Sequence, residues 1–364
     1  MRGIVSCCRC YLPVVWLTLV NAFCLFSILY DDISCANETE PEGIANSNDN
    51  AQQPFRGMFS VHSQDVEDAL NAGQTMKVVD LSTESFANLA PLIKLNPQTL
   101  ILTECDEITD FSPLQEMTSL KVLRLSGTQF ADLRLLTGLK LQTLSLCGCP
   151  IKDYSPLAKI TTLRELRVSG REAGASLHVL RNLHLEILWL ENDHLGNEID
   201  FTVLEGAKEL KTLFLRFVND VNCEKLARLR LQNLAFDNCE GISNLRAVSQ
   251  IGSLQDFRII ENSVSDVSFL SGLSLRSLAL RNCGKLTDIS PLAGMTTLKK
   301  LALSGSSVSS LAPLRNLRLQ ELEIDYCMGI ADLSPLHGQT SLQWFSADGT
   351  QFGNTPLSEI IKAQ

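Results

Sequence analysis

Cysteine is the residue type in this sequence whose spacing is most regular. One series of positions runs Cys105, Cys149, Asp193, Cys239, Cys283 and Cys327, with steps of 44, 44, 46, 44 and 44 residues. A fixed period is typical of a structural repeat, whose copies lie apart in space. A catalytic or metal centre instead needs side chains that converge on one point. The cysteine series therefore predicts a repeated structural position.

The other candidates for chemistry do not form a constellation. The five histidines fall in different segments, at His62, His178, His184, His194 and His337. None has the spacing from a Cys, Asp or Glu that a metal site or a catalytic triad requires. The sequence also contains no Gly-rich phosphate loop and no nucleophile elbow. We therefore expect no enzymatic activity, no metal and no cofactor.

The cysteines belong to a short repeated phrase. Each phrase reads apolar, any, aliphatic, any, any and then a mostly small or polar residue. Thirteen phrases begin at Val79, Leu100, Leu123, Leu144, Leu166, Leu188, Leu213, Leu234, Phe257, Leu278, Leu301, Leu322 and Phe345, in steps that centre on 22 residues. Because alternate residues of a strand face opposite sides, the two apolar residues of a phrase should point together into a core. Stacked copies then bury a face that one copy cannot bury alone.

The phrases LILTEC, LSLCGC, LALRNC and LEIDYC resemble the leucine-rich repeat. The segments that follow them, such as ITDFSPL and LTDISPL, are similar to the bacterial internalin type of that repeat. The resemblance covers roughly residues 76 to 350. It implies an α/β leucine-rich repeat solenoid (a horseshoe) with one long parallel sheet on the concave face and short 3₁₀ or helical turns on the convex face. It also implies a scaffold that binds a partner.

This architecture decides how the cysteines can behave. Consecutive members of the series lie two strands apart, or about 9.6 Å at twice the strand spacing. A disulfide needs Cα atoms within about 7 Å, and zinc ligands must lie about 2.3 Å from one ion. We therefore predict reduced, buried structural thiols that bond backbone groups where strands end. They are Cys105, Cys149, Cys239, Cys283 and Cys327.

Turn and cap residues delimit the solenoid. Asp-x-Ser-Pro recurs at Asp110, Asp153, Asp288 and Asp332 and is typical of a turn in which Asp bonds nearby backbone donors. A capping helix is expected at Ser63–Leu70 within an N-terminal cap of residues 56–75. After the thirteen repeats, residues 351–364 should form a C-terminal cap, with Thr355 as N-cap and Pro356 in the first helical position.

The residue between the two apolar positions of a phrase should face the concave side. There Trp189 and Phe214 are neighbours. The same region departs from the repeat at the last position of the phrase, the corner, with Asp193 in place of the cysteine and Arg171 and Val218 in place of small residues. Trp and Arg are enriched in binding hot spots. The predicted partner-binding residues are Arg124, Arg167, Trp189, Glu191, Phe214, Arg216, Phe217 and Arg258. The alternative is drift of the repeat, with a longer convex helix over residues 201–213.

The N-terminus has the pattern of an export segment. Residues 10–30 are uncharged and follow Arg2 and Arg9, so residues 1–36 are expected to be a signal peptide cleaved after Ala36, or an uncleaved membrane anchor. Residues 37–55 read as an acidic, disordered tether. The net charge of −10 argues against nucleic acid as a partner.

Together these features predict an exported or membrane-anchored protein that binds another protein through its concave face. A monomer is expected, with membrane contact only through residues 10–30. Two alternatives stay open: a structural or adhesive component of the cell envelope, and a regulator that inhibits an enzyme by wrapping it.

Overall fold

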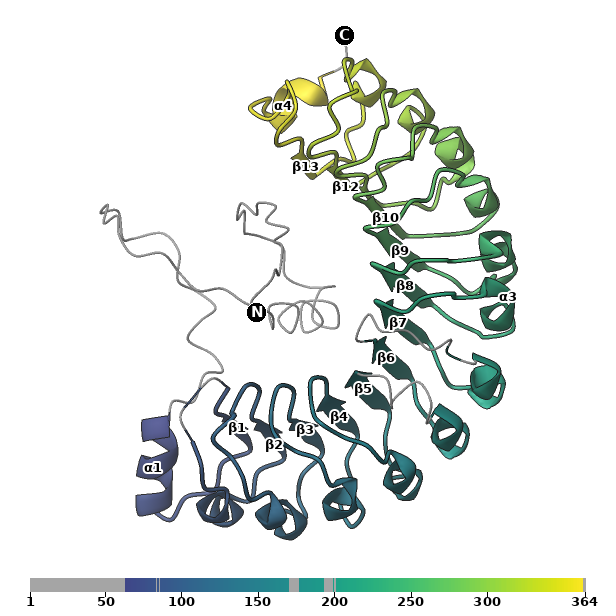
Figure 1. The fold of residues 1–364 in the computed structure, drawn as a ribbon. Coiled ribbons are helices and arrows are strands. Elements are labelled where there is room, and N and C mark those ends of the chain that lie inside the picture. The colour runs from purple at the N-terminus through teal and green to yellow at the C-terminus, as the bar shows by residue number, and fades with distance from the viewer. Residues whose placement is uncertain are drawn as a thin grey trace, which may run out of the picture. The chain divides into compact units, whose positions relative to one another are not determined.

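In a computed structural model, the structure describes residues 63–362 except 83, 85, 170–176, 193–198 and 200. The chain divides into units 1–53 and 54–364, and all described residues belong to the second. The predicted export segment and tether, and the positions Arg171 and Asp193, lie outside the described residues. The second unit is a curved solenoid with strands along its inner side and short helical turns along its outer side (Figure 1).

One parallel sheet of thirteen strands follows the order of the sequence. The strands are β1 (Val78–Asp80), β2 (Thr99–Ile101), β3 (Val122–Arg124), β4 (Thr143–Leu146), β5 (Glu165–Ser169), β6 (Ile187–Glu191), β7 (Thr212–Arg216), β8 (Asn233–Asp237), β9 (Asp256–Ile260), β10 (Ser277–Arg281), β11 (Lys300–Ala302), β12 (Glu321–Glu323) and β13 (Trp344–Ser346). Val79 pairs with Leu100, Leu100 with Leu123, and so on to Phe345. The predicted fold and its register are therefore confirmed.

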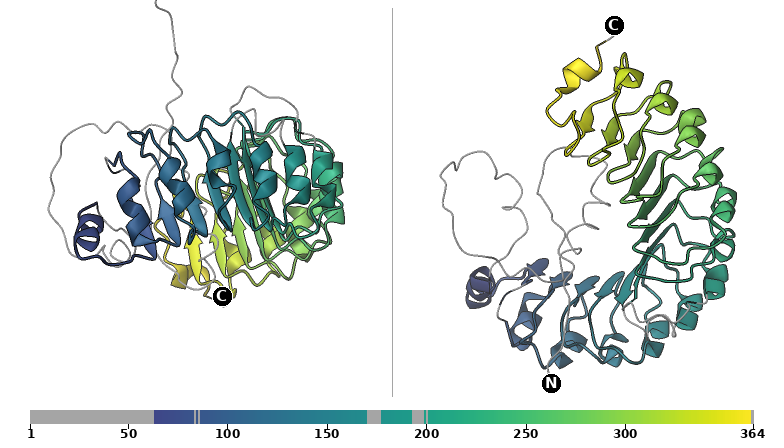
Figure 2. Two further views of the ribbon diagram at one scale, coloured as in Figure 1. Left: turned by 90° about the horizontal axis from the view of Figure 1, so that it is seen from below. Right: turned by 45° about the horizontal axis from the view of Figure 1, so that its top comes forward.

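The outer side consists mainly of single 3₁₀ turns (Figure 2). They are η2 (Ala90–Leu95), η3 (Ser112–Glu116), η4 (Leu133–Leu136), η5 (Ser155–Lys159), η6 (Leu177–Asn182), η7 (Phe201–Gly206), η8 (Leu245–Gln250), η9 (Ser268–Leu270), η10 (Ser290–Gly294), η11 (Ala312–Leu314) and η12 (Ser334–Leu336). The α-helices are α1 (Ser63–Asn71), α3 (Cys223–Leu226) and α4 (Leu357–Ile360). A 3₁₀ turn uses fewer residues than an α-helix for the same crossing, which suits a repeat of about 22 residues.

The core lies between the sheet and the turns and runs the whole length of the solenoid. Leu123 and Leu125, the two apolar residues of one phrase, are fully buried, as is Leu136 on the turn that follows. Burying one such side chain contributes about 1.5–3 kcal/mol relative to leaving it in water. Because every repeat contributes the same positions, no repeat has a separate core.

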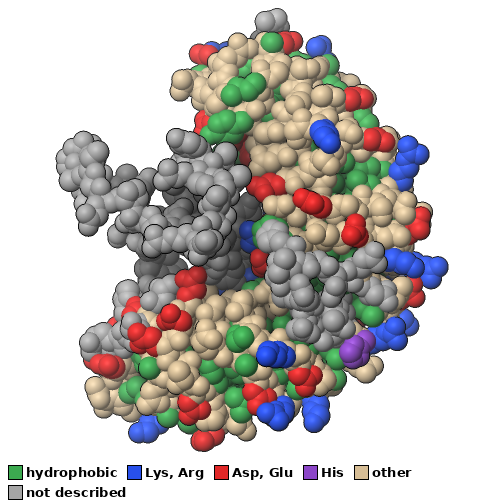
Figure 3. All heavy atoms as spheres, viewed as in Figure 1, with side chains coloured by type: hydrophobic (Ala, Val, Ile, Leu, Met, Phe, Trp, Pro, Cys, Tyr) green, Lys and Arg blue, Asp and Glu red, His purple; other side chains and the backbone are tan. Residues whose placement is uncertain are grey.

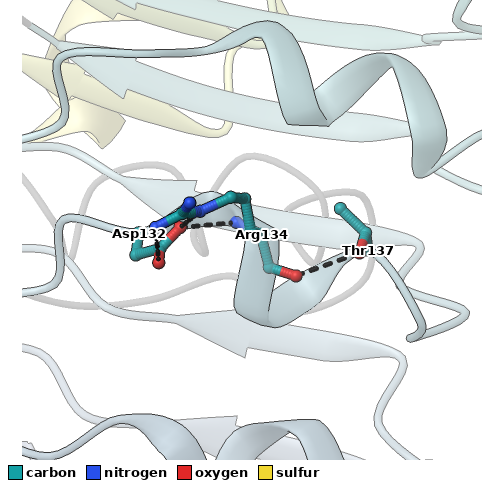
Figure 4. Close-up of polar contacts among 3 residues, drawn as sticks. All are labelled: Asp132, Arg134 and Thr137. Carbon is teal, nitrogen blue, oxygen red and sulfur yellow. Dashed lines mark hydrogen bonds and ion pairs between the residues drawn. The ribbon is translucent and has the colours of Figure 1, made fainter.

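The Asp-x-Ser-Pro segments start the turns as predicted. The Oδ1 atoms of Asp110, Asp153, Asp288 and Asp332 each accept a hydrogen bond, at 2.8–2.9 Å, from the backbone N–H two residues later. Asp132 does the same toward Arg134 and also binds its guanidinium, while the Thr137 hydroxyl donates to the Arg134 carbonyl (Figure 4). These bonds satisfy backbone donors that have no partner within a short turn.

A left-handed residue ends nearly every strand segment that the structure describes. This residue stands directly before the last position of the phrase, the corner, in ten phrases. The ten residues have φ between 48° and 75° and are Glu104, Gly127, Gly148, Phe217, Asn238, Glu261, Asn282, Gly305, Tyr326 and Gly349. Gly and Asn adopt this conformation most easily, so their frequency here is expected. Phe217 and Tyr326 are exceptions, because they are bulky residues that adopt the same left-handed conformation.

Two sequence expectations about helices were wrong. The C-terminal helix α4 is a single turn whose N-cap is Pro356, without a side-chain cap bond, so Thr355 is not the N-cap. A longer convex helix over residues 201–213 does not form, because Phe201–Gly206 is a 3₁₀ turn and Thr212 already begins β7. In both places burial of apolar residues against the adjacent repeat prevails over local helix signals. None of the described helices is long and apolar enough to span a membrane.

Candidate binding surface on the concave sheet

Trp189 and Phe214 form the centre of the concave surface. They pair across β6 and β7, and their rings stack with centroids 4.9 Å apart and planes at 29°. The Arg167 guanidinium lies 5.7 Å from the centre of the Trp189 ring, within the range of a cation–π contact. Three neighbouring strands thus contribute one stacked row of planar groups.

This row is more buried than the sequence suggested. Trp189 is 9% exposed, Phe214 8% and Arg167 3%. An isolated large side chain on a sheet would stand in solvent, but here each one covers the next. The aromatic side chains predicted to be exposed are therefore packed against each other, and only a small part of each is accessible.

Charged side chains border the aromatic row. The Arg167 Nε atom lies 3.0 Å from Glu165, and Arg216 lies within 3.7 Å of Glu191 and 3.3 Å of Asp237. Arg216, Glu191 and Asp237 are each about a quarter exposed, so they are the accessible part of the surface. Arg216 also lies 4.7 Å from the ring of the half-buried Phe217.

Asp237 is the titratable group of this border with a shifted pKa. Burial raises the pKa of its carboxyl, while nearby Arg216 lowers it and Glu261 raises it further. The raised pKa means that desolvation outweighs the attraction of Arg216. A cationic partner group beside Asp237 would therefore relieve an existing electrostatic cost.

The structure brings together six of the eight predicted residues. They are Arg167, Trp189, Glu191, Phe214, Arg216 and Phe217. Arg124 and Arg258 lie on the same face but two strands from the row, with Ser145 and Ala235 on the strands between. Sequence reasoning missed Glu165 and Asp237, although each lies an even number of residues from a central concave position and so shares its face.

The five thiols of the series occupy equivalent corners. Each sulfhydryl donates to the backbone carbonyl 24 residues earlier, on the preceding strand segment: Cys105 to Leu81, Cys149 to Leu125, Cys239 to Leu215, Cys283 to Ile259 and Cys327 to Leu303, at 2.9–3.8 Å. None of the seven described cysteines forms a disulfide. Burial raises the pKa of Cys149 to about 11 and that of Cys239 to about 12, which keeps both thiols protonated.

In the repeats that alternate with the cysteine repeats, the side chain at the corner makes a different hydrogen bond. The Thr128 hydroxyl donates to Leu125 in its own strand segment, and the Asn262 amide donates to the Cys239 carbonyl. The Leu125 carbonyl thus receives both Thr128 and the thiol of Cys149. Among the described residues, no group of three His, Cys, Asp or Glu could hold a metal ion.

Comparison with known proteins supports the fold. No protein-family model matches the sequence, and no curated protein matches it. The structure is similar to internalin InlF from Listeria monocytogenes, with 22% identity, 78% of this chain and 83% of that chain covered, and a TM-score of 0.56. It is also similar to TLR13 in a complex with ssRNA13, with 16% identity, 78% and 51% coverage and a TM-score of 0.55. Thirteen parallel strands in one register, short outer turns and these structural neighbours show that this chain is a leucine-rich repeat solenoid.

Proposed function

We propose that this protein is exported and binds another protein through the concave cluster, defined as Arg167, Trp189, Glu191, Phe214, Arg216 and Phe217. The observation that carries the proposal is the stacked row of Arg167, Trp189 and Phe214 with its border of charged groups. Aromatic and Arg side chains of this kind dominate the energy of known interfaces.

The cluster is already ordered before a partner arrives. Arg167 is held by both Glu165 and Trp189, so it loses little side-chain freedom on binding. Ordering a flexible side chain at an interface costs about 0.5–1.5 kcal/mol, which a preformed cluster avoids. Glu191, Arg216 and Asp237 remain accessible and can exchange ion pairs with a partner. A partner with a basic group near Asp237 and an apolar residue over the ring edges would fit best.

The experiment uses ligands selected in vitro, because it then needs no knowledge of the natural partner. A displayed library of random peptides is selected on the full chain, and the enriched peptides are titrated against the wild type and two variants. The double variant Arg167→Ala/Trp189→Ala removes two of the three members of the row, and Arg216→Gln removes the positive charge of Arg216 from the border while retaining much of the side-chain length. We expect each variant to weaken binding by about tenfold or more, as loss of a hot-spot residue does.

Lys300→Ala is the matched control. Lys300 is on the concave face of β11, outside the cluster, and pairs with Glu321 at 2.8 Å. Its substitution should leave binding unchanged, and thermal unfolding of every variant reports whether the fold persists. Enriched peptides that bind the double variant as well as the wild type would refute the concave site.

A further inference from the structure

The two flanks of the solenoid carry opposite charge. All thirteen strands are parallel, so every strand begins at one flank and ends at the other. We name the entry flank from the described residues between each helical turn and the next strand. The exit flank consists of the described residues between each strand and the next turn. This division follows from topology alone. The charged residues of the sequence are distributed unevenly between the two flanks.

The entry flank is basic. It contains twelve Lys or Arg and two Asp or Glu, the acids being Glu186 and Glu209. Its cations include Lys77, Lys121, Lys140, Lys208, Arg230 and Arg276, all of them exposed. Lys211 pairs with Glu186, but the acids are too few to neutralise the flank. The flank therefore carries a net charge of +10 within a protein of net charge −10.

The exit flank is acidic. Its described residues include fifteen Asp or Glu and two Lys, which are Lys152 and Lys285. The net charge of this flank is −13. Exposed acids occur along the arc, from Glu104 through Glu240 to Asp332. The face visible in Figure 3 carries Asp and Glu side chains from end to end, with Lys and Arg mainly toward its outer border.

A groove is part of the entry flank. It has a volume of about 790 Å³ and lies where the chain enters β8 to β11. Gln232, Gln255, Arg276 and Lys299 line it, together with Ser and Thr hydroxyls. Amides, hydroxyls and cations without aromatic rings suit carboxylates rather than an apolar ligand. The groove offers a recess for acidic side chains on the surface that faces it.

We propose that the basic entry flank of one copy docks against the acidic exit flank of a second copy. The complementary surface is on the same chain, it follows the same arc, and it has nearly equal and opposite charge. Such a contact joins two different faces, so it is heterologous and leaves both outer flanks open. It therefore builds stacks rather than closed dimers. This inference goes beyond the proposed concave site and does not depend on it, and it differs from the monomer expected from sequence.

The first test is the salt dependence of self-association. Sedimentation velocity of the full chain is compared at about 20 mM and about 500 mM salt, where the Debye length falls from about 20 Å to about 4 Å. We expect larger species to grow with protein concentration at low salt and to dissociate at high salt. A wild type that stays monomeric at low salt over the whole concentration range would overturn the proposal.

Charge-reversed variants make the test specific. Lys121→Glu, Lys208→Glu and Arg230→Glu together lower the net charge of the entry flank from +10 to +4, whereas Asp106→Lys, Glu107→Lys and Glu240→Lys together change that of the exit flank from −13 to −7. Every one of these positions is exposed, so the fold should persist, and circular dichroism checks this. Each triple variant alone should self-associate less than the wild type at low salt, because the charge of one of its two flanks is about halved. An equal mixture of the two should associate again, because one supplies the basic surface and the other the acidic one.

The same variants identify other occupants of the entry flank. The wild type and the variant with the weakened entry flank (Lys121→Glu/Lys208→Glu/Arg230→Glu) are titrated with anionic lipid vesicles and with a single-stranded RNA oligomer. Binding of either probe by the wild type without self-association would assign the flank to that anion and refute the proposal. Association that is as strong in each variant alone as in the wild type, or that is no stronger in the mixture than in either variant, would refute it as well. Selected peptides whose binding requires the concave cluster should bind both variants normally, which separates this test from that of the proposed function.

Discussion

At the scale of single residues, the thiols act as small hydrogen-bond donors that fit a crowded corner. A Cys side chain at this position reaches the carbonyl of the preceding repeat while remaining buried, as Cys239 does at 3.2 Å from Leu215. Serine would donate a stronger bond but would also bring a more polar group into the core. We propose that Cys105, Cys149, Cys239, Cys283 and Cys327 have this structural role.

Substitution of Cys239 tests that role. Cys239→Ala removes the sulfur and leaves the Leu215 carbonyl without this donor, so we expect a loss of about 1–3 kcal/mol in the free energy of unfolding. Denaturant unfolding measures the change. Peptide-level labelling with iodoacetamide provides a second readout, because the thiols of the series should react only after unfolding. Rapid labelling of Cys239 in the native protein would contradict a buried, protonated thiol.

The left-handed positions show what the sequence could and could not reveal at this scale. Gly127, Gly148, Asn238, Asn282, Gly305 and Gly349 all precede a corner, and that enrichment is a visible signal for positive φ. Phe217 and Tyr326 have the same conformation, but their bulky side chains give no sequence signal for a positive φ. The burial of Trp189 and Phe214 was likewise beyond the sequence, because it depends on how closely the neighbouring strands bring the rings together.

At the scale of elements, the turns depend on ionised aspartates. Hydrogen bonds from Ser112, Ser155, Ser290 and Ser334 hold the pKa values of Asp110, Asp153, Asp288 and Asp332 below the ordinary value. A carboxyl whose pKa is lower in the folded state contributes stability above its unfolded pKa of about 3.9. That stability is lost as the pH falls through the folded-state value.

Replacing these four aspartates by asparagine should flatten the acid limb of the stability profile. Asn retains the side-chain oxygen acceptor, and Asn88 and Asn222 already serve in this way in other turns. We expect the quadruple variant to resemble the wild type near neutral pH and to lose less stability below about pH 4. Thermal unfolding between neutral and acid pH measures both. Asp237, Asp256 and Asp325, whose pKa values burial raises, are unchanged in the variant, so the difference isolates the turns.

The register of the elements was the most predictable part of the fold. Strand side chains alternate with a period of two, and each phrase places its two apolar residues on one face, so Leu123 and Leu144 had to pair for the core to be continuous. The helix ends were less predictable. Thr355 and Pro356 give the local signals of a helix start, but the helix begins one residue later, at Leu357 with Pro356 as N-cap. Its Ile360 is buried.

At the scale of the whole molecule, each repeat is stabilised only by its contacts with the adjacent repeats. In a solenoid each repeat contacts the repeats beside it, so a defect at one end should loosen that end first. The C-terminal end is closed by Ile360, 2% exposed, with Leu357 and Ile361 packed against the same core. The two charged flanks belong to this scale as well, since no single repeat carries enough charge to define them.

Ile360→Asp tests this one-dimensional coupling. A carboxylate at this buried position should detach α4 and expose the last repeats to solvent. We expect faster amide hydrogen exchange in β12 and β13 and unchanged exchange in β1 to β4. Lys362→Asp, at an exposed position beyond α4, is the matched control and should leave both regions unchanged. Equal loss of protection along the whole sheet would show instead that the solenoid unfolds as one cooperative unit.

The alternation of corner donors also bears on how such a chain can grow. A duplication or loss of 44 residues adds or removes one position of the cysteine series and one of the intervening series, so the alternation seen at Thr128, Cys149 and Asn262 is kept. A change of 22 residues would instead place two positions of the same series side by side. The arc is thus expected to change length in steps of two repeats, about 44 residues, during evolution.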